Sequence, residues 1–343
     1  MSSPSLTVID IHAWFGGSSS ARRAVAALIG DACSTSGFFQ IVGHGIHVSV
    51  LEDALNEIDG FFQLPIATKM AVAPPASNIN RGFLALGSET ISYTVGVDSP
   101  TDLREAFVIG PEMVPDDDIH GADPYRVFAP NYWPDDRDKF RSALLAYFDA
   151  AGALAHTLVD IYSVALGLDE HHFRPSLDHS TETLRVNYYE RLTEQPADEG
   201  QHRLGAHTDY GITTVLYADS MPGLQLLDEV GVWHDVIAEP GALIVNLGDL
   251  LAQWTNDRWR STIHRVVASD GLGDRRRSIA FFLDGNYDAI IECLPTCCDV
   301  GNPPRYAPTT AGEHLVEKLR GARTHSKSET LNTVGDRALG IER

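Results

Sequence analysis

The stretch Arg203-Leu-Gly-Ala-His-Thr-Asp-Tyr-Gly-Ile-Thr-Thr-Val-Leu-Tyr217 decides the fold, because it belongs to a series of short strand-like runs separated by turns. Pro222-Gly223 and Pro240-Gly241 are two of the turn sequences between these runs. Several short strands at this spacing indicate a sandwich, jelly roll or barrel rather than a parallel α/β sheet. The expected strands are Leu184–Tyr189, Thr213–Tyr217, Leu224–Leu227, Val232–Val236, Ala242–Leu247, Ile263–Ala268 and Ser278–Leu283.

Helices are expected on both sides of this strand-rich region, which gives a mixed α+β chain. Apolar residues recur at helical spacing over 134–167 and predict one long helix, against which a sheet can pack. The stretch 74–110 is rich in turn-forming residues and is expected to be mainly loop. Shorter helices are expected over 21–34, 49–62 and 313–322, and further strands at Leu6–Asp10 and Gly37–Gly45.

Composition limits the classes of partner. The formal net charge is −21, with 47 acidic against 26 basic residues, and such a charge repels nucleic acid and anionic membranes. The start of the chain lacks the basic and apolar regions of a signal peptide, and we find no apolar run of membrane-spanning length. We therefore expect a cytoplasmic protein. The four cysteines show no CxxC spacing and are expected to be reduced thiols, and the sequence does not indicate the oligomeric state.

Two histidines and one aspartate form a candidate metal site. His207 and Asp209 are two residues apart, so on an extended segment their side chains point to the same side. His264 begins a later strand and can complete the set. Two imidazoles and one carboxylate leave open coordination positions, the arrangement typical of non-haem Fe(II) oxygenases. A closed structural zinc site usually includes thiolates, and no cysteine lies near either histidine in the sequence.

A candidate anion site follows this set. Arg276 and Ser278 are also two residues apart, so a guanidinium and a hydroxyl can face one cavity and hold a carboxylate. Upstream, Asn187 and Tyr189 share a face of another expected strand and can add polar donors. A small acid is therefore an expected ligand beside the metal.

The chain resembles the iron(II)/2-oxoglutarate-dependent dioxygenases of the isopenicillin N synthase-like family. The order of several modest motifs, from about Val8 to Phe282, carries the resemblance. The motifs are Gly37-Phe-Phe-Gln-Ile-Val-Gly-His-Gly45, Phe61-Phe-Gln-Leu-Pro65, Leu184-Arg-Val-Asn-Tyr-Tyr189, Ala206-His-Thr-Asp209, Gly223-Leu-Gln-Leu-Leu227, Asn246-Leu-Gly-Asp249, His264-Arg-Val266 and Arg276-Arg-Ser278. One departure is Glu190, where many relatives have proline.

The resemblance implies a distorted double-stranded β-helix, or jelly roll, flanked by helices. It implies one catalytic domain over 1–343, with an N-terminal region over 1–120 and the jelly-roll core over 180–290. Fe(II) would be held by His207, Asp209 and His264, and 2-oxoglutarate by Arg276 and Ser278, with Asn187 and Tyr189 nearby. With O2 as co-substrate, such an enzyme hydroxylates, desaturates or cyclises a small molecule at an unactivated C–H bond and releases succinate and CO2.

The residues that contact the primary substrate lie outside these motifs. Loops carry much of the specificity in such an architecture. The candidates are Arg81, Phe83, Phe107, Phe282 and the C-terminal helix, each with plain packing as the competing interpretation.

Three other functions stay open from the residues. One is an oxidase of the same family that does not use 2-oxoglutarate, because Arg-x-Ser can also hold a carboxylate of the substrate. Another is a jelly-roll protein that binds a small acid without turnover, although unpaired His and Asp in a cavity are costly unless they bind something. The third is a zinc hydrolase, which would need a general base near the metal and would leave Arg276 and Ser278 unexplained.

Overall fold

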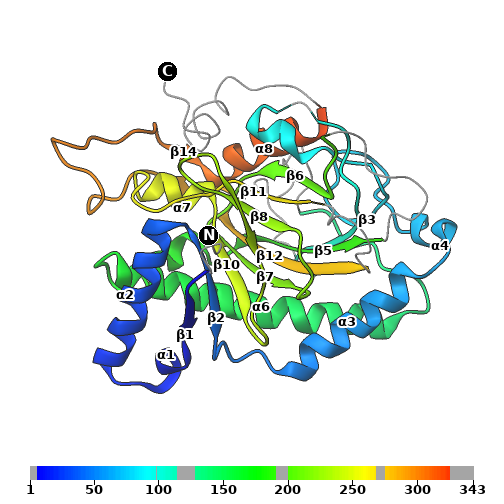
Figure 1. Cartoon of the computed structure of the whole chain (residues 1–343), viewed down its shortest axis with the longest axis horizontal. Coiled ribbons are helices and arrows are strands. Elements are labelled where there is room, and N and C mark those ends of the chain that lie inside the picture. Colours follow the sequence, from blue (N-terminus) through cyan, green and yellow to red (C-terminus); the bar gives the residue numbers. More distant parts are fainter. Residues whose placement is uncertain (1–5, 98, 114–127, 191–199, 268–274, 325–343) are drawn as a thin grey trace.

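Two β-sheets form the centre of the molecule (Figure 1). A computed structural model describes residues 6–97, 99–113, 128–190, 200–267 and 275–324. The larger sheet has eight strands, and only its first pair, β1 with β2, is parallel. Its order is β1 (Val8–Asp10), β2 (Phe38–Val42), β10 (Leu243–Leu247), β7 (Thr213–Ala218), β12 (Arg276–Asn286), β5 (Ser180–Tyr189), β4 (Glu105–Ile109) and β3 (Gly82–Leu84).

The smaller sheet has four antiparallel strands, and it carries both histidines of the candidate metal site. Its order is β6 (Leu204–His207), β11 (His264–Val266), β8 (Leu224–Leu227) and β9 (Trp233–Val236). Consecutive strands β5 to β12 alternate between the two sheets in several places, so residues far apart in sequence become neighbours. A separate short pair, β13 (Ile290–Ile291) with β14 (Thr309–Thr310), precedes the last helix.

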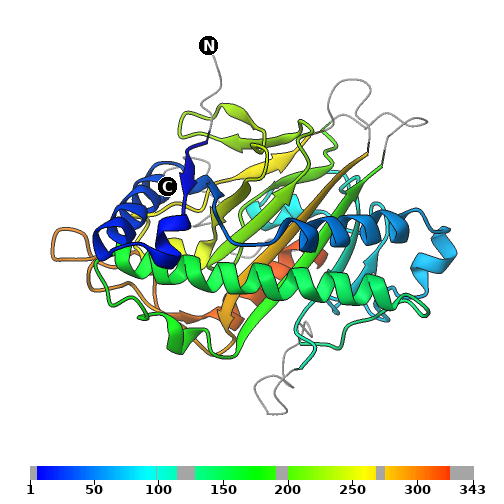
Figure 2. The same cartoon turned by 90° about the horizontal axis from the view of Figure 1, so that it is seen from below.

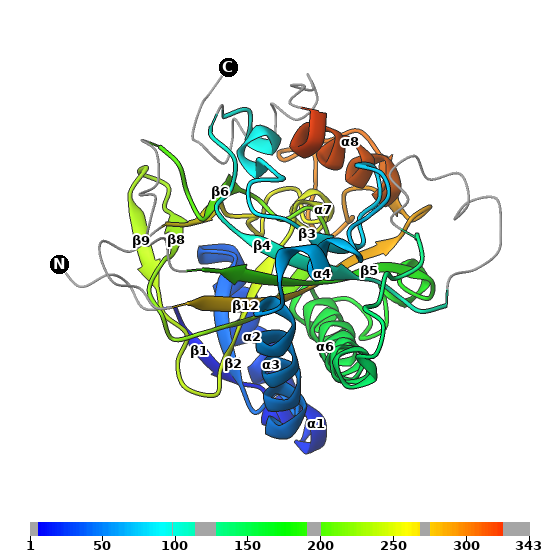
Figure 3. The same cartoon turned by 90° about the vertical axis from the view of Figure 1, so that its right-hand side faces the viewer.

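Three helices cover the outer face of the larger sheet (Figures 2 and 3). They are α2 (Ser19–Thr35), α3 (Val48–Phe62) and the long α6 (Asp138–Ala165). The remaining helices are short or lie at the opposite side, as α8 does in Figure 3. These are α1 (His12–Gly16), α4 (Ile66–Met70), η1 (Ile91–Val95), η2 (Arg174–Ser176), α7 (Asp249–Trp254) and α8 (Ala311–Thr324).

The long helix α6 is held by its apolar face. Phe140, Leu144, Phe148 and Leu158 recur at helical spacing and are all buried. Phe148 packs edge-on against Phe281 of β12, with ring centroids 5.2 Å apart. By length and composition α6 would also be able to cross a membrane, but 56% of its most apolar window is buried inside this protein. It is a core helix.

The expected mixed α+β fold, with a sheet-rich centre, flanking helices and one long helix, is confirmed. The expected loop over 74–110 is partly wrong. It contains β3 and β4, which extend the larger sheet beyond β5. All five residues of β4 are buried, so the alternation that marks a half-exposed strand is missing from the sequence. In the strand expected over Ile263–Ala268, Ala268 lies outside the described residues.

Candidate functional site

His207 and His264 meet because their strands are neighbours. They occupy directly opposed positions of the antiparallel pair β6–β11, and their ring centroids are 4.2 Å apart. Opposed residues on one face of such a pair are close by geometry alone. The edge of Phe38 packs against His264 at 5.1 Å between centroids, which helps to fix that ring. A cross-strand register thus brings together two imidazoles that are distant in sequence.

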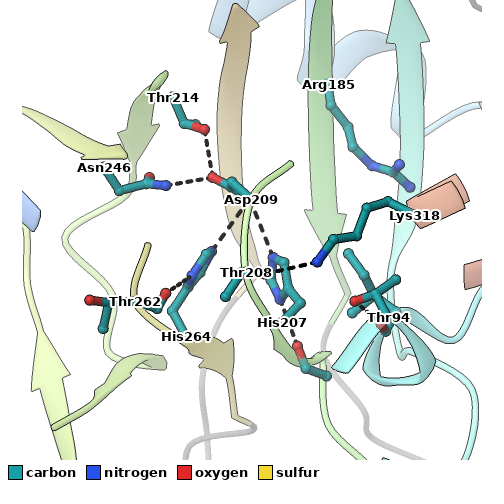
Figure 4. A network of polar contacts seen from close by, with 12 residues as sticks. Thr94, Arg185, His207, Thr208, Asp209, Thr214, Asn246, Thr262, His264 and Lys318 are labelled. Atoms are coloured by element: carbon teal, nitrogen blue, oxygen red, sulfur yellow. Dashed lines mark hydrogen bonds and ion pairs between the residues drawn. The ribbon is translucent and has the colours of Figure 1, made fainter. Parts of the chain in front are cut away.

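Asp209 completes a three-residue group with these histidines (Figure 4). Its Oδ1 lies 3.7 Å from Nε2 of His207 and 3.7 Å from Nε2 of His264. Its Oδ2 accepts hydrogen bonds from Thr214 Oγ1 at 2.5 Å and from Asn246 Nδ2 at 2.6 Å. One carboxylate oxygen is therefore fixed by the protein, and the other faces the two imidazoles.

The hydrogen bonds of the imidazoles define their tautomers. Nδ1 of His207 lies 2.8 Å from the carbonyl oxygen of Gly205, and Nδ1 of His264 lies 3.0 Å from that of Thr262. A carbonyl only accepts, so each Nδ1 carries a hydrogen, and Nε2 is the ring nitrogen that faces Asp209. Burial, with the nearby His264, lowers the pKa of His207 well below its ordinary value. The three residues can hold a divalent transition metal, and hydrogen bonds to the backbone and to Thr214 and Asn246 orient their side chains.

Arg276, Ser278 and Tyr189 form a buried polar group on the neighbouring strands β12 and β5. Arg276 and Ser278 are 2% and 3% exposed on β12, and the intervening Arg277 faces the other way. The Arg276 guanidinium lies 5.1 Å from the ring centre of Tyr189, its neighbour on β5. Among the described residues, Nε and Nη1 of Arg276 and the Tyr189 hydroxyl have no hydrogen-bond partner. Buried donors of this kind fit an anionic ligand such as a carboxylate.

Asn187 lies between this group and a cavity. Its Nδ2 is 3.4 Å from Ser278 Oγ, and its Oδ1 accepts a short hydrogen bond from Arg104. The cavity has a volume of about 810 Å³ with its open mouth included. Its lining includes Asn187, His207, Asp209, Phe282, Asp284 and Leu315.

Of the four expected substrate contacts, the structure places only Phe282 in the cavity lining. Phe83 and Phe107 are 1% exposed and pack with Phe61 of α3, so the expectation of substrate contact is corrected to core packing. Arg81 is fully buried, donates from Nη1 to the carbonyl of Asn80 at 2.7 Å, and is not part of the lining. A Cβ at Gly110 would be 1.9 Å from Arg81 Nη2, which shows how tightly this guanidinium is enclosed.

The core position of Phe107 and the cavity position of Phe282 give a matched pair of substitutions. Phe107→Ala is expected to lower the free energy of unfolding by about 3–5 kcal/mol, because it leaves a cavity among packed aromatic rings. Phe282→Ala is expected to raise the KM for the primary substrate and to cost less stability. Urea unfolding and steady-state kinetics measure the two effects. A larger KM change in Phe107→Ala than in Phe282→Ala would contradict this placement.

An ion pair at the site was not predicted from the sequence. Lys318 of α8 lies 2.6 Å from Asp249 at the start of α7, and both side chains are fully buried. Asp249 Oδ2 also accepts from Thr208 Oγ1 at 3.1 Å, and the backbone N–H of Asp249 donates to the Asp209 carbonyl at 2.9 Å. Figure 4 shows the side chain of Lys318 reaching Thr208, the residue between His207 and Asp209 in the sequence. Helix α8 is thus fixed to the segment that carries His207 and Asp209, and its Leu315 and Leu319 line the cavity.

Two acidic residues in the cavity lining differ in their surroundings. Glu89 forms ion pairs with Arg104, at 3.1 Å, and with Arg185. Within the part of the chain that the structure describes, Asp284 has no such partner, and burial together with the charge of Asp209 raises its pKa to about 7. Neither residue could be recognised from the sequence, because neither belongs to the short patterns that identify the site.

Comparisons with known proteins agree with this geometry. Residues 6–136 match the family described as non-haem dioxygenase in morphine synthesis N-terminal, and residues 180–285 match the 2OG-Fe(II) oxygenase superfamily. A 2-oxoglutarate-Fe(II) type oxidoreductase of Emericella nidulans is 34% identical, with 92% of this chain and 88% of that protein covered. Validamycin A dioxygenase of Streptomyces hygroscopicus subsp. limoneus is 33% identical, with 92% and 86% covered.

Solved structures with the same fold include enzymes bound to the co-substrate. Full-length Neurospora crassa T7H in complex with alpha-KG matches with a TM-score of 0.80 at 29% identity, covering 91% of this chain and 94% of that one. A putative 2OG-Fe(II) oxygenase family protein from Caulobacter crescentus also matches with a TM-score of 0.80, at 27% identity, covering 93% and 99%. With these relatives and the site described above, the chain belongs to the 2OG-Fe(II) oxygenase superfamily.

Proposed function

We propose that this enzyme uses His207, Asp209 and His264 to hold Fe(II), and Arg276 and Ser278 to hold 2-oxoglutarate, while a small molecule is oxidised in the adjoining cavity. The observation that carries the proposal is the cross-strand histidine pair, whose two Nε2 atoms converge on the free oxygen of Asp209. Fe(II) with 2-oxoglutarate and O2 supplies the oxidising power for an unactivated C–H bond, with succinate and CO2 as the co-products.

Hydrogen bonds from the surrounding residues hold the side chains of the three proposed metal ligands in place. Thr214 and Asn246 hold Asp209 through Oδ2, so that the carboxylate does not rotate away when the site is empty. The carbonyl groups of Gly205 and Thr262 each accept a hydrogen bond from Nδ1, which orients both imidazoles and leaves Nε2 as the nitrogen available to a cation. The site is thereby organised before the metal arrives, and little rearrangement opposes binding.

The polar group on β12 and β5 suits the distal carboxylate of 2-oxoglutarate. The Arg276 fork matches two carboxylate oxygens, and the Ser278 hydroxyl adds a third donor. The Tyr189 hydroxyl is another buried donor, and Asn187 orients Ser278. Arg203, 5% exposed, also lies over the Tyr189 ring at 5.9 Å, so a second cation adds to the positive field. An anion entering this group relieves the repulsion between two guanidiniums.

Replacing Arg276 by lysine is expected to raise the 2-oxoglutarate concentration required for half-maximal rate by about 10–100-fold, because an ammonium cannot reproduce the bidentate contact. Arg277→Lys on the outward face of the same strand is the matched control and is expected to change that requirement less than about twofold, since Arg277 pairs with Asp59. Initial rates of succinate formation at varied 2-oxoglutarate test both. Equal effects of the two variants would place the carboxylate elsewhere.

The alternatives are less well supported. Two fungal relatives that the chain matches are named 2-oxoglutarate-Fe(II) type oxidoreductases, which disfavours an oxidase without 2-oxoglutarate. A zinc hydrolase has no use for the unpaired Arg276, and a silent binding protein has no use for a complete set of metal donors. The alternating β5–β12 order supports our assignment of a jelly roll over 180–290, within one catalytic domain that includes the N-terminal region 1–120. We propose a cytoplasmic enzyme with neither nucleic acid nor membrane as a partner.

The test of this function follows succinate. The purified protein is supplied with Fe(II), 2-oxoglutarate and air, in the presence of a panel of small candidate substrates. We expect succinate that depends on Fe(II) and on O2, increased by those compounds that fit the cavity. Absence of succinate with every compound, under conditions where Fe(II) is bound, would contradict the proposed function.

A further inference from the structure

The inner face of β12 carries a second functional group beyond Arg276 and Ser278. Asp284 lies further along the strand, past Phe282, and lines the same cavity as His207 and Asp209. Its side chain is 93% removed from solvent, as its residual exposure is 7%. Across the described ranges, its carboxylate makes neither a hydrogen bond nor an ion pair with another side chain or with the backbone. This is unusual for a buried acid.

The place of this carboxylate is tightly defined. A Cβ at Gly211 would lie 2.0 Å from Asp284 Oδ1, so the carboxylate packs directly on the backbone that follows Asp209. Glycine is required there, and a larger residue would displace the acid. The carboxylate is therefore held at the wall of the cavity, close to the segment of the metal site.

The charges around Asp284 leave it uncompensated. Burial raises the pKa of Asp284, the negative charges of Asp209 and Glu182 raise it further, and the charge of Arg81 lowers it. Arg81 is enclosed beside Gly110 and donates to the Asn80 carbonyl, so it does not neutralise Asp284 by contact. Glu89, the other acid in the lining besides Asp209, has two arginine partners. Among the described residues of the lining, Glu89 is thus paired with cations, whereas Asp284 is not.

A buried carboxylate without a partner costs free energy, and a ligand that donates a hydrogen bond to it recovers that cost. A cationic donor recovers more than a neutral one, because it also neutralises the charge. An anionic group at this position would be repelled by the ionised carboxylate, whereas a cation favours that ionised form. The complement of Asp284 is therefore a positively charged nitrogen with at least one N–H.

We propose that Asp284 is a specificity-determining residue that binds a protonated amine of the primary substrate. The proposal rests on the proposed function, since it places this amine in the cavity where the substrate is oxidised. The substrate class is then a small, amine-bearing molecule that places its amine at Asp284 and its reacting carbon at the metal site, because both line one cavity. Phe282, next to Asp284, provides apolar surface for the carbon skeleton.

The test compares two rings of the same size. Piperidine is protonated at neutral pH, whereas tetrahydropyran has an ether oxygen in place of the NH2 group and donates no hydrogen bond. Each is titrated by ligand-observed NMR against the protein loaded with Zn(II), in place of Fe(II), and with 2-oxoglutarate. We expect wild-type protein to bind piperidine at least about tenfold more tightly than tetrahydropyran, a difference of about 1.4 kcal/mol.

Asp284→Asn keeps the shape and removes the charge, and it is expected to reduce the preference to less than about twofold. Asp149→Asn, the same change on the exposed side of α6, is the control and should keep the preference. Asp284→Asn removes an unpaired buried charge, so the variant should unfold at no lower temperature than wild type. Equal binding of both rings, no binding of piperidine, or an unchanged preference in Asp284→Asn would overturn the proposal.

Different results would contradict the oxygenase function and the amine site at Asp284. If succinate forms as described above but both rings bind equally, the oxygenase function stands and the role of Asp284 falls. If no succinate forms while the preference for piperidine depends on Asp284, the amine site stands and the oxygenase function falls.

Discussion

Replacement of Asp209 by alanine is expected to reduce succinate formation to less than about one thousandth of the wild-type rate. The change removes the only carboxylate of the three-residue metal group and leaves the two imidazoles, whose Nε2 atoms then face an empty space. It also leaves Thr214 Oγ1 and Asn246 Nδ2 without their acceptor. Iron retained after gel filtration and initial rates of succinate formation measure the two consequences.

A graded series makes this result specific to the metal site. Thr214→Val keeps the shape of the side chain and removes one hydrogen bond to Asp209, so we expect a loss of about 10–100-fold. Asp149→Ala changes an exposed acid on α6 and is expected to leave the rate unchanged. If Asp209→Ala retained iron and activity like Asp149→Ala, another residue would have to supply the third ligand.

Replacement of Lys318 by methionine is expected to lower the free energy of unfolding by about 3–5 kcal/mol at neutral pH, because it leaves Asp249 buried without its cation. Burial alone would raise the pKa of Asp249, but Lys318 and His314 outweigh it and lower that pKa. The contribution of the pair is therefore complete above the ordinary aspartate pKa of about 4 and is lost as the pH falls further. Urea unfolding at several pH values measures this dependence.

The matched variants separate the ion pair from simple loss of packing. Adding Asp249→Asn to Lys318→Met removes the uncompensated charge, and we expect most of the lost stability to return. Lys139→Met on the exposed side of α6 should change stability by less than about 0.5 kcal/mol. A loss that persists in the double variant, or that does not depend on pH, would show that Lys318 acts through packing alone.

The sequence predicts those parts of the site whose residues lie close together in the chain. Arg276 and Ser278 are two residues apart on β12, and the period of an extended strand places them on one side. The structure agrees, since Arg277 between them faces outward to Asp59. His207 is the last residue of β6, and Asp209 lies just beyond the strand but still faces His207. The roles of these residues as ligands remain predictions.

Contacts between segments that are distant in the sequence could not be predicted from it. Lys318 and Asp249 are both completely buried, but each is a single charged residue in a helical or turn sequence, and nothing local marks it as half of a pair. The lack of an ion-pair partner for Asp284 among the described residues could not be predicted either, because it depends on which residues pack around this carboxylate. For the same reason Phe83 and Phe107, in a stretch that reads as loop, were expected near the substrate and lie in the core.

Short elements were also missed for a physical reason. Helices α1, α4 and α7 contain too few turns to show a helical period of apolar residues, whereas α6 spans 28 residues and shows it clearly. The long helix nevertheless begins at Asp138 rather than near Pro134, because Asp136 has a left-handed backbone with φ 57°.

The most direct test of the account is an anaerobic titration followed in the visible spectrum. Fe(II) is added to the protein and then 2-oxoglutarate, whose chelation of the metal gives a weak charge-transfer band that free Fe(II) and 2-oxoglutarate lack. We predict this band in the wild-type protein, none in Asp209→Ala, and a band that requires at least about tenfold more 2-oxoglutarate in Arg276→Lys. An unaltered band in Asp209→Ala would contradict the assignment of the metal site.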